Sequence, residues 1–99
     1  MTREDLKAIS EDFIKQTLLE YLPPNTQVFI FGSRARGDAR WNSDYDLWIN
    51  DEISNETLHN IQEKLEESFV PFSVDIVTKK QLENDLFSQQ LKKDCKPWM

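Results

Sequence analysis

Cysteine and histidine are almost absent from this sequence, and glycine is scarce. The 99 residues include one cysteine, one histidine and two glycines. A single cysteine cannot form a disulfide within the chain, and one cysteine with one histidine cannot supply the ligands of a structural zinc site. No apolar run approaches the length of a membrane span, and the charged residues 1–5 do not resemble a signal peptide. We therefore expect a single cytoplasmic domain over residues 1–99 that does not enter a membrane.

Positive charge is in the minority. The chain has 12 Lys and Arg residues against 18 Asp and Glu residues, a formal net charge of −6. Stable binding to a nucleic-acid backbone needs a basic face, so we do not expect it of this chain alone. The acidic balance is compatible with a nucleotide bound together with a divalent cation, because the cation neutralises nearby carboxylates.

The spacing of apolar residues predicts helices that alternate with short strands. Helices are expected over 2–22, 55–69 and 78–91, strands over 28–31, 45–50 and 72–77, and a turn or short helix over 33–37. In the first helix, the residues expected to face the core are Leu6, Ile9, Phe13, Thr17 or Leu18, and Tyr21. Residues 92–99 are expected to form a tail, and the sequence leaves open whether its apolar end, Pro97-Trp98-Met99, frays or docks.

Gly32 and Ser33 follow directly after the apolar strand expected over 28–31. Glycine at this junction allows the backbone to approach a phosphate closely, and the serine adds a hydroxyl donor. An ordinary turn has the same composition, so this pair alone is weak evidence for a phosphate site.

Asp44 and Asp46 are two residues apart on an expected strand, so their side chains point to the same face. Two like charges side by side repel unless something neutralises them, and carboxylates at this spacing suit Mg²⁺. Asp75, in a later strand of small and apolar residues, adds a third carboxylate. Three carboxylates on two strands are able to hold two metal ions for displacement at phosphorus, although solvated positions at a strand edge are the alternative.

These residues together resemble the signature of the polymerase-beta-type nucleotidyltransferase superfamily. The pattern consists of Gly32-Ser33, ten intervening residues, Asp44-Tyr45-Asp46 and then Asp75. The short length, with Arg34, Gly37 and the run Ser43-Asp44-Tyr45-Asp46-Leu47, is similar to the minimal nucleotidyltransferases of prokaryotes. The resemblance covers the whole chain and implies an α/β (α+β) fold of the polymerase-beta type, with a small mixed β-sheet backed by helices.

The resemblance also implies a set of roles. Asp44, Asp46 and Asp75 would be the catalytic carboxylates and the ligands of two Mg²⁺ ions, and Gly32 and Ser33 would hold the phosphates of ATP. The reaction would transfer AMP from the nucleotide to an acceptor hydroxyl. The implied partner is a helical HEPN-type ribonuclease, the toxin of a toxin–antitoxin pair, which some relatives inactivate by adenylylation.

Arginine pairs well with phosphate, so Arg34 and Arg36 are further candidates for nucleotide binding, with a solvated loop as the alternative. Trp41 could stack on a base or pack locally. Two other functions stay open: an antitoxin that neutralises its partner by binding alone, and a free-standing enzyme acting on a small molecule. The second lacks an acceptor domain, since the expected catalytic core occupies nearly all of the 99 residues.

Overall fold

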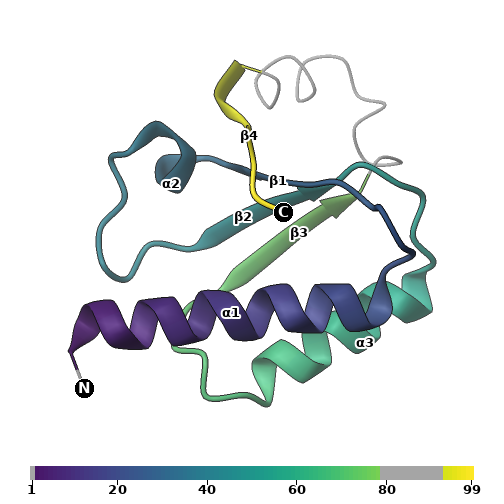
Figure 1. Cartoon of the computed structure of the whole chain (residues 1–99), viewed down its shortest axis with the longest axis horizontal. Helices are drawn as coiled ribbons and strands as arrows, with labels where there is room; N and C mark the ends of the chain where they lie inside the picture. Colours follow the sequence, from purple (N-terminus) through teal and green to yellow (C-terminus); the bar gives the residue numbers. More distant parts are fainter. Residues whose placement is uncertain (1, 79–92) are drawn as a thin grey trace.

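A four-stranded sheet with two long helices on one side makes up the computed structural model, which describes residues 2–78 and 93–99 (Figure 1). The elements in chain order are α1 (Arg3–Tyr21), β1 (Val28–Phe31), α2 (Ser33–Arg36), β2 (Tyr45–Ile49), α3 (Asn55–Glu66), β3 (Val74–Thr78) and β4 (Lys96–Pro97). The helix predicted over 78–91 lies outside the described residues except for Thr78. Its placement at a helix start was wrong, because Thr78 continues β3 opposite Ile49.

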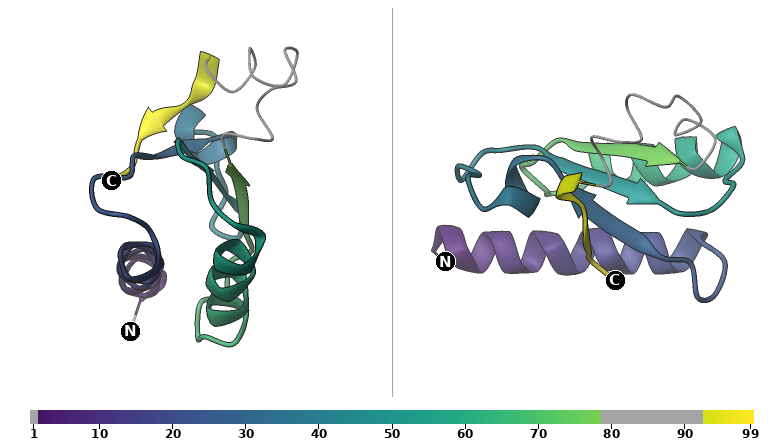
Figure 2. Two further views of the ribbon diagram at one scale, coloured as in Figure 1. Left: turned by 90° about the vertical axis from the view of Figure 1, so that its right-hand side faces the viewer. Right: turned by 90° about the horizontal axis from the view of Figure 1, so that it is seen from above.

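The sheet is mixed, with the strand order β3-β2-β1-β4. β1 runs antiparallel to β2 and β4, whereas β2 and β3 are parallel. The parallel pair is joined through α3, and α1 and α3 lie side by side against the same face of the sheet (Figures 1 and 2). The fold class expected from the sequence, a small mixed sheet backed by helices, is confirmed.

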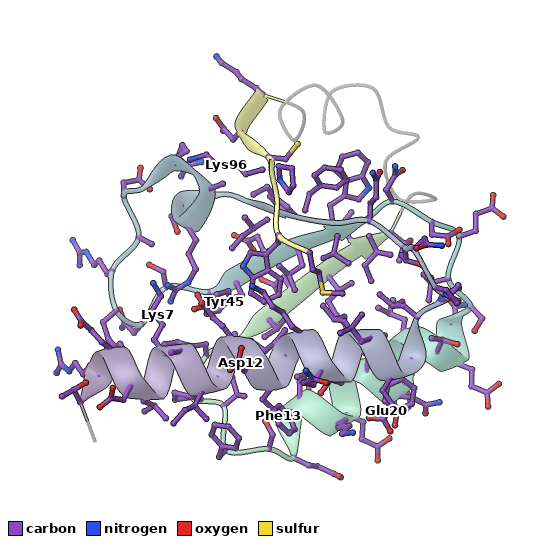
Figure 3. The ribbon with its side chains drawn as sticks, viewed as in Figure 1. Lys7, Asp12, Phe13, Glu20, Tyr45 and Lys96 are labelled. Atoms are coloured by element: carbon purple, nitrogen blue, oxygen red, sulfur yellow. The ribbon has the colours of Figure 1, made fainter. Side chains whose placement is uncertain are left out.

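The core lies between the sheet and these two helices. β2 alternates as expected: Tyr45, Leu47 and Ile49 are buried on the helix side, and Asp46 and Trp48 face the other way. The Tyr45 hydroxyl donates a hydrogen bond of 2.8 Å to a carboxylate oxygen of Glu11, directed from β2 toward α1 (Figure 3). The alternation therefore separates an apolar face, which folds the domain, from a carboxylate face.

The first helix begins with the predicted capping box: the Thr2 hydroxyl accepts from the Asp5 amide, and the Asp5 carboxylate accepts from the Thr2 amide. Its predicted buried stripe was partly wrong. The buried residues are Ser10, Ile14, Thr17 and Leu18, whereas Ile9 is 42% exposed. The buried face of α1 thus includes two small polar residues, Ser10 and Thr17. The Thr17 hydroxyl donates a hydrogen bond to the Phe13 carbonyl, which satisfies it inside the protein.

The second long helix ends at Glu66, three residues before the predicted end. The Ser68 hydroxyl and amide both donate to the Leu65 carbonyl, which closes the last turn locally. Phe69, expected on the buried stripe, is instead 52% exposed and packs edge-on against Phe13, with ring centroids 5.3 Å apart. Because the Ser68 hydroxyl takes a backbone carbonyl of the last turn, the helix ends before the end of its apolar pattern at Phe69.

The end of the chain is docked. Lys96 and Pro97 form β4 beside Ile30 and Phe29 of β1. The Trp98 amide donates to the Val28 carbonyl at 2.9 Å. The indole of Trp98 lies 6.0 Å from the Tyr45 ring, with the Lys15 ammonium 4.6 Å from its centre. The question that the sequence left open is settled in favour of docking on the chain's own sheet.

Replacement of Trp98 by alanine should therefore destabilise the fold. We expect a loss of about 2 kcal/mol in the free energy of unfolding, less than the cost for a fully buried tryptophan because the indole is half-buried. Urea denaturation followed by circular dichroism measures it. Lys96→Ala, an exposed change in the same segment, should stay within about 0.5 kcal/mol of the parent. Equal stability of Trp98→Ala and the parent would show that the docking contributes little.

Candidate active site

The turn between β1 and α2 brings the backbone against a carboxylate. Gly32 has φ 73° and ψ −151°, a conformation that essentially only glycine adopts. A Cβ atom at this position would lie 2.5 Å from Oδ2 of Asp46. Asp46 is opposite Phe31 in the register of β1 and β2, so its side chain lies beside the glycine that follows. Close approach of the two strands thus requires glycine at position 32.

The three predicted carboxylates lie on one side of the sheet. Asp46 and Asp75 are direct neighbours in the parallel pair of β2 and β3, and Asp44 precedes β2 by one residue. Asp44 and Asp75 are exposed, whereas Asp46 is half-buried. Burial raises the pKa of Asp46, and the charges of Asp75 and Asp44 raise it further. The positive charge of Arg36 acts on Asp46 in the opposite direction.

This donor set fits a magnesium ion in its chemistry. Within residues 2–78 and 93–99, no group of three or more His, Cys, Asp or Glu side chains is arranged to hold a metal ion by itself. Mg²⁺ does not need such a cage, because it binds through one or two carboxylates and completes its shell with water and substrate phosphates. Burial is the largest cause of the raised pKa of Asp46, and the neighbouring charges of Asp75 and Asp44 add to it; a cation would relieve this repulsion between carboxylates.

The two candidate arginines point in different directions. The guanidinium group of Arg34 lies on the α1 side of the sheet, 3.9 Å from the centre of the Tyr45 ring, and donates to backbone carbonyls of the following loop. Arg36 is exposed, pairs with Asp38 at 3.3 Å and Asp94 at 3.5 Å, and is the arginine that acts on Asp46. The structure therefore brings Arg36, and not Arg34, toward the carboxylates.

Ser33 is the first residue of α2, directly after Gly32. Its carbonyl accepts from the amides of Gly37 and Asp38, both at 3.1 Å, which closes the short helix. Gly37 takes the left-handed conformation at the end of this turn, with φ 84°. Ser33 thus opens the short helix directly after the glycine whose backbone lies against Asp46.

The loop tryptophan Trp41 packs locally. Its ring meets Phe72 edge-on, with centroids 5.0 Å apart, and the Arg3 guanidinium lies 5.7 Å from its centre. Trp48, on the carboxylate face of β2, stacks on Phe29 at 4.9 Å. Both indole rings thus pack against another aromatic ring within the chain. The sequence had offered local packing as the alternative to base stacking for Trp41.

Residues 12–97 match the protein family described as the nucleotidyltransferase domain. The chain belongs to this nucleotidyltransferase family. It is also 38% identical, over 78 residues, to a Haemophilus influenzae protein named "Probable protein adenylyltransferase MntA". This match covers 74% of the present nucleotidyltransferase and 65% of the relative, so the chain spans just under two thirds of the relative's length.

Solved structures share the fold of this nucleotidyltransferase. A crystal structure of a toxin–antitoxin complex with AMP-PNP matches with a TM-score of 0.67 and 27% identity, over 89% of this chain and 72% of the other. A structure described as a "putative minimal nucleotidyltransferase" matches with a TM-score of 0.67 and 26% identity, over 99% of this chain and 97% of the other. The polymerase-beta-type fold expected from the sequence is thereby confirmed. None of the helices in the described part of the nucleotidyltransferase is long and apolar enough to span a membrane.

Proposed function

We propose that this nucleotidyltransferase transfers AMP from Mg-ATP to a hydroxyl group on a partner protein. The observation that carries the proposal is the contact between the Gly32 backbone and the Asp46 carboxylate, with Asp75 beside it on the next strand. The contact puts the turn that would hold phosphates next to the groups that would hold metal. The MntA relative, named as an adenylyltransferase, and the toxin–antitoxin complex with AMP-PNP support the same reaction.

The site residues divide the tasks of the proposed reaction among them. Gly32 lets the backbone approach the triphosphate, and Ser33 donates its hydroxyl to a phosphate oxygen. Asp75 accepts the proton of the acceptor hydroxyl, whose oxygen forms a bond to the α-phosphorus of ATP. The bond from that phosphorus to the oxygen of the β-phosphate breaks, and pyrophosphate leaves. Arg36, which is exposed and near Asp46, is the better placed of the two arginines to pair with the phosphates.

Two magnesium ions would be held by Asp44 and Asp46, with Asp75 as the third carboxylate on the catalytic ion. When bound, these ions neutralise the triphosphate and lower the charge that opposes attack by the hydroxyl. Without the ions, the negative charges of the carboxylates and of the triphosphate would repel one another. Because ATP is the substrate and the sequence has only one cysteine, the proposed reaction belongs to the cytoplasm.

Replacement of Ser33 by alanine should weaken the use of ATP without unfolding the chain. A hydrogen bond to a charged group contributes roughly 1.5–3 kcal/mol, so we expect kcat/KM for ATP to fall about ten- to a hundredfold. Steady-state kinetics with saturating acceptor measures the effect. Ser54→Ala, which removes the hydroxyl that caps α3 far along the chain, serves as the control for a general loss of stability. If Ser33→Ala has the same kcat/KM as the parent, the Ser33 hydroxyl does not bind phosphate and the residue serves only the turn.

The acceptor is proposed to be a helical HEPN-type toxin, with a tyrosine hydroxyl as the modified group. The described elements account for one sheet and its covering helices, with no further domain to bind an acceptor among them. AMP carries a bulky anionic phosphate, and near the active site of a ribonuclease it would repel RNA phosphates and block access. The structural relative is itself a toxin–antitoxin complex.

Incubation of the partner with this chain and Mg-ATP should raise the partner's intact mass. Each transferred AMP should add about 329 Da, the mass of AMP less one water. Intact-mass spectrometry measures it, and reactions with the Asp44→Asn and Asp46→Asn variants should leave the mass unchanged. Tight binding with no change in mass would contradict the enzyme function. It would favour the alternative, an antitoxin that neutralises its partner by stoichiometric contact. Transfer to a small molecule in place of the partner would favour a free-standing enzyme.

A further inference from the structure

The guanidinium group of Arg34 contacts two backbone carbonyls and two aromatic rings of its own chain. Its Nε and Nη2 atoms donate to the Ser43 carbonyl at 3.2 and 2.8 Å, and Nη2 also donates to the Trp41 carbonyl at 3.1 Å. The guanidinium carbon lies 3.9 Å from the centre of the Tyr45 ring and 5.1 Å from that of Phe72. No ion pair links Arg34 to a carboxylate among residues 2–78 and 93–99.

The accepting carbonyl has a specific place in the chain. It belongs to the peptide group that joins Ser43 to Asp44, so its orientation sets the direction in which the backbone enters Asp44. The loop also has its own turn, in which the Ser43 hydroxyl accepts from the Arg40 amide at 2.8 Å and the Ser43 amide donates to the Arg40 carbonyl at 3.1 Å. Asp44 itself is exposed and lies just outside β2. Its position therefore depends on how the loop is held.

We propose that Arg34 is a positioning residue that holds the loop over residues 37–44 and thereby fixes Asp44 for metal binding. This inference rests on the proposed function for the role of Asp44, and it replaces phosphate binding as the role of Arg34. Two features fit arginine to the task. Its planar, rigid group of donors reaches two carbonyls at once, and its flat face stacks on an aromatic ring. To reach a phosphate on the carboxylate side, Arg34 would have to give up all of these contacts.

The geometry also separates Arg34 from Arg36. Side chains two residues apart in a helix differ in direction by about 200°. Arg34 is accordingly directed to the α1 side, where the pocket of residues Lys7, Glu11 and Trp98 opens, whereas Arg36 is paired with Asp38 and Asp94. Substitution of the two arginines should therefore have different effects, although they belong to the same four-residue helix.

The first test uses the chain alone, without ATP or a partner. In Arg34→Ala, the ¹⁵N order parameter of the Asp44 amide should fall from about 0.85, the value of rigid backbone, to below about 0.6. Guanidinium chloride at low millimolar concentration should restore part of the order, because the ion can occupy the vacated position. Arg36→Ala should leave the Asp44 amide rigid. An unchanged order parameter in Arg34→Ala would overturn the proposal, and thermal unfolding identifies a variant that has lost its fold.

The second test uses Arg34→Lys, which keeps the charge and most of the stem and removes the planar fork. Isothermal titration with Mn²⁺ should show weakening of about tenfold or more, the order of loss seen when a group that orients a metal ligand is removed. Affinity for ATP without metal should change less than about threefold if Arg34 does not touch phosphate. A larger loss of ATP affinity with unchanged Mn²⁺ affinity would restore the phosphate role and overturn the proposal. If Asp44 loses order as expected but the parent shows no AMP transfer, the positioning role stands and the proposed function fails.

Discussion

Asp46→Asn is expected to abolish AMP transfer while the fold remains intact. Asp46 is the carboxylate that contacts the Gly32 backbone and lies directly across from Asp75. Asparagine keeps the shape of the side chain but removes the charge that would hold magnesium. We expect the rate to fall by about a thousandfold or more, the order of loss that follows removal of one group that stabilises charge in the transition state.

The thermal stability of the same variant should not fall with its activity. Burial and the charges of Asp75 and Asp44 disfavour the ionised form of Asp46, and they raise its pKa. A neutral amide removes this repulsion, so the metal-free variant should melt at the temperature of the parent or above it. Differential scanning calorimetry without magnesium measures this temperature. A melting temperature well below the parent's would assign the loss of activity to misfolding.

The control for Asp46→Asn is Asp12→Asn, a change of the same kind on the exposed side of α1 (Figure 3). Asp12 lies on the helix that covers the opposite face of the sheet from the carboxylates, so transfer should continue at the parental rate. The proposed site would be wrong if Asp46→Asn retained full turnover at saturating Mg-ATP and acceptor.

Gly32→Ala is the second change for which we expect a large effect. Its backbone conformation, φ 73° and ψ −151°, costs a residue with a side chain about 1–3 kcal/mol. The added methyl group would also lie 2.5 Å from the Asp46 carboxylate oxygen and 3.3 Å from its carbon, so the strands must separate or the carboxylate must move. We expect transfer to fall by about a hundredfold or more, because small displacements of catalytic groups have effects of this size.

Gly37→Ala is the matched control, because it introduces the same methyl group at the other glycine of the chain. Gly37 also has positive φ, 84°, but an added Cβ atom would meet nothing within 4 Å. Urea denaturation should show a loss in both variants, about 1–2 kcal/mol for Gly37→Ala from the left-handed backbone alone. Assays below the unfolding transition should show the larger loss of transfer in Gly32→Ala only. Equal losses of activity would mean that backbone strain, and not contact with Asp46, controls the site.

Strands β1 to β3, although not β4, and the carboxylate face could be predicted because they depend on short-range alternation. Once Tyr45 and Leu47 are buried, a period of two residues puts Asp46 and Asp44 on the other side whatever the neighbouring strands are. That Asp75 is directly opposite Asp46 was not predictable in this way. It depends on the register of a parallel pair whose strands are joined by a helix, and the sequence pattern does not encode that register directly.

Other predictions were wrong because the residue types of a helix do not determine which of its faces packs against the rest of the protein. Ile9 is apolar but exposed, whereas Ser10 is buried, since the packing of α1 against the sheet and α3 decides which face turns inward. The two arginines of α2 were grouped by residue type. In the four-residue helix that the structure shows, Arg34 and Arg36 cannot point the same way. Only the positions of the Ser43 carbonyl and the Tyr45 ring decide which one faces the core.

The pairing of β4 with β1 has a consequence for synthesis on the ribosome. β1 is made in the first third of the chain, but its outer neighbour consists of residues 96 and 97. Domains fold as the chain emerges, and contacts between distant segments form slowly because a long loop must close first. Until that segment is released, the outer edge of β1 presents unpaired amides and carbonyls, the kind of edge at which another chain can add a strand. We therefore expect the nascent protein to be exposed to strand-mediated aggregation until residues 96–98 reach β1.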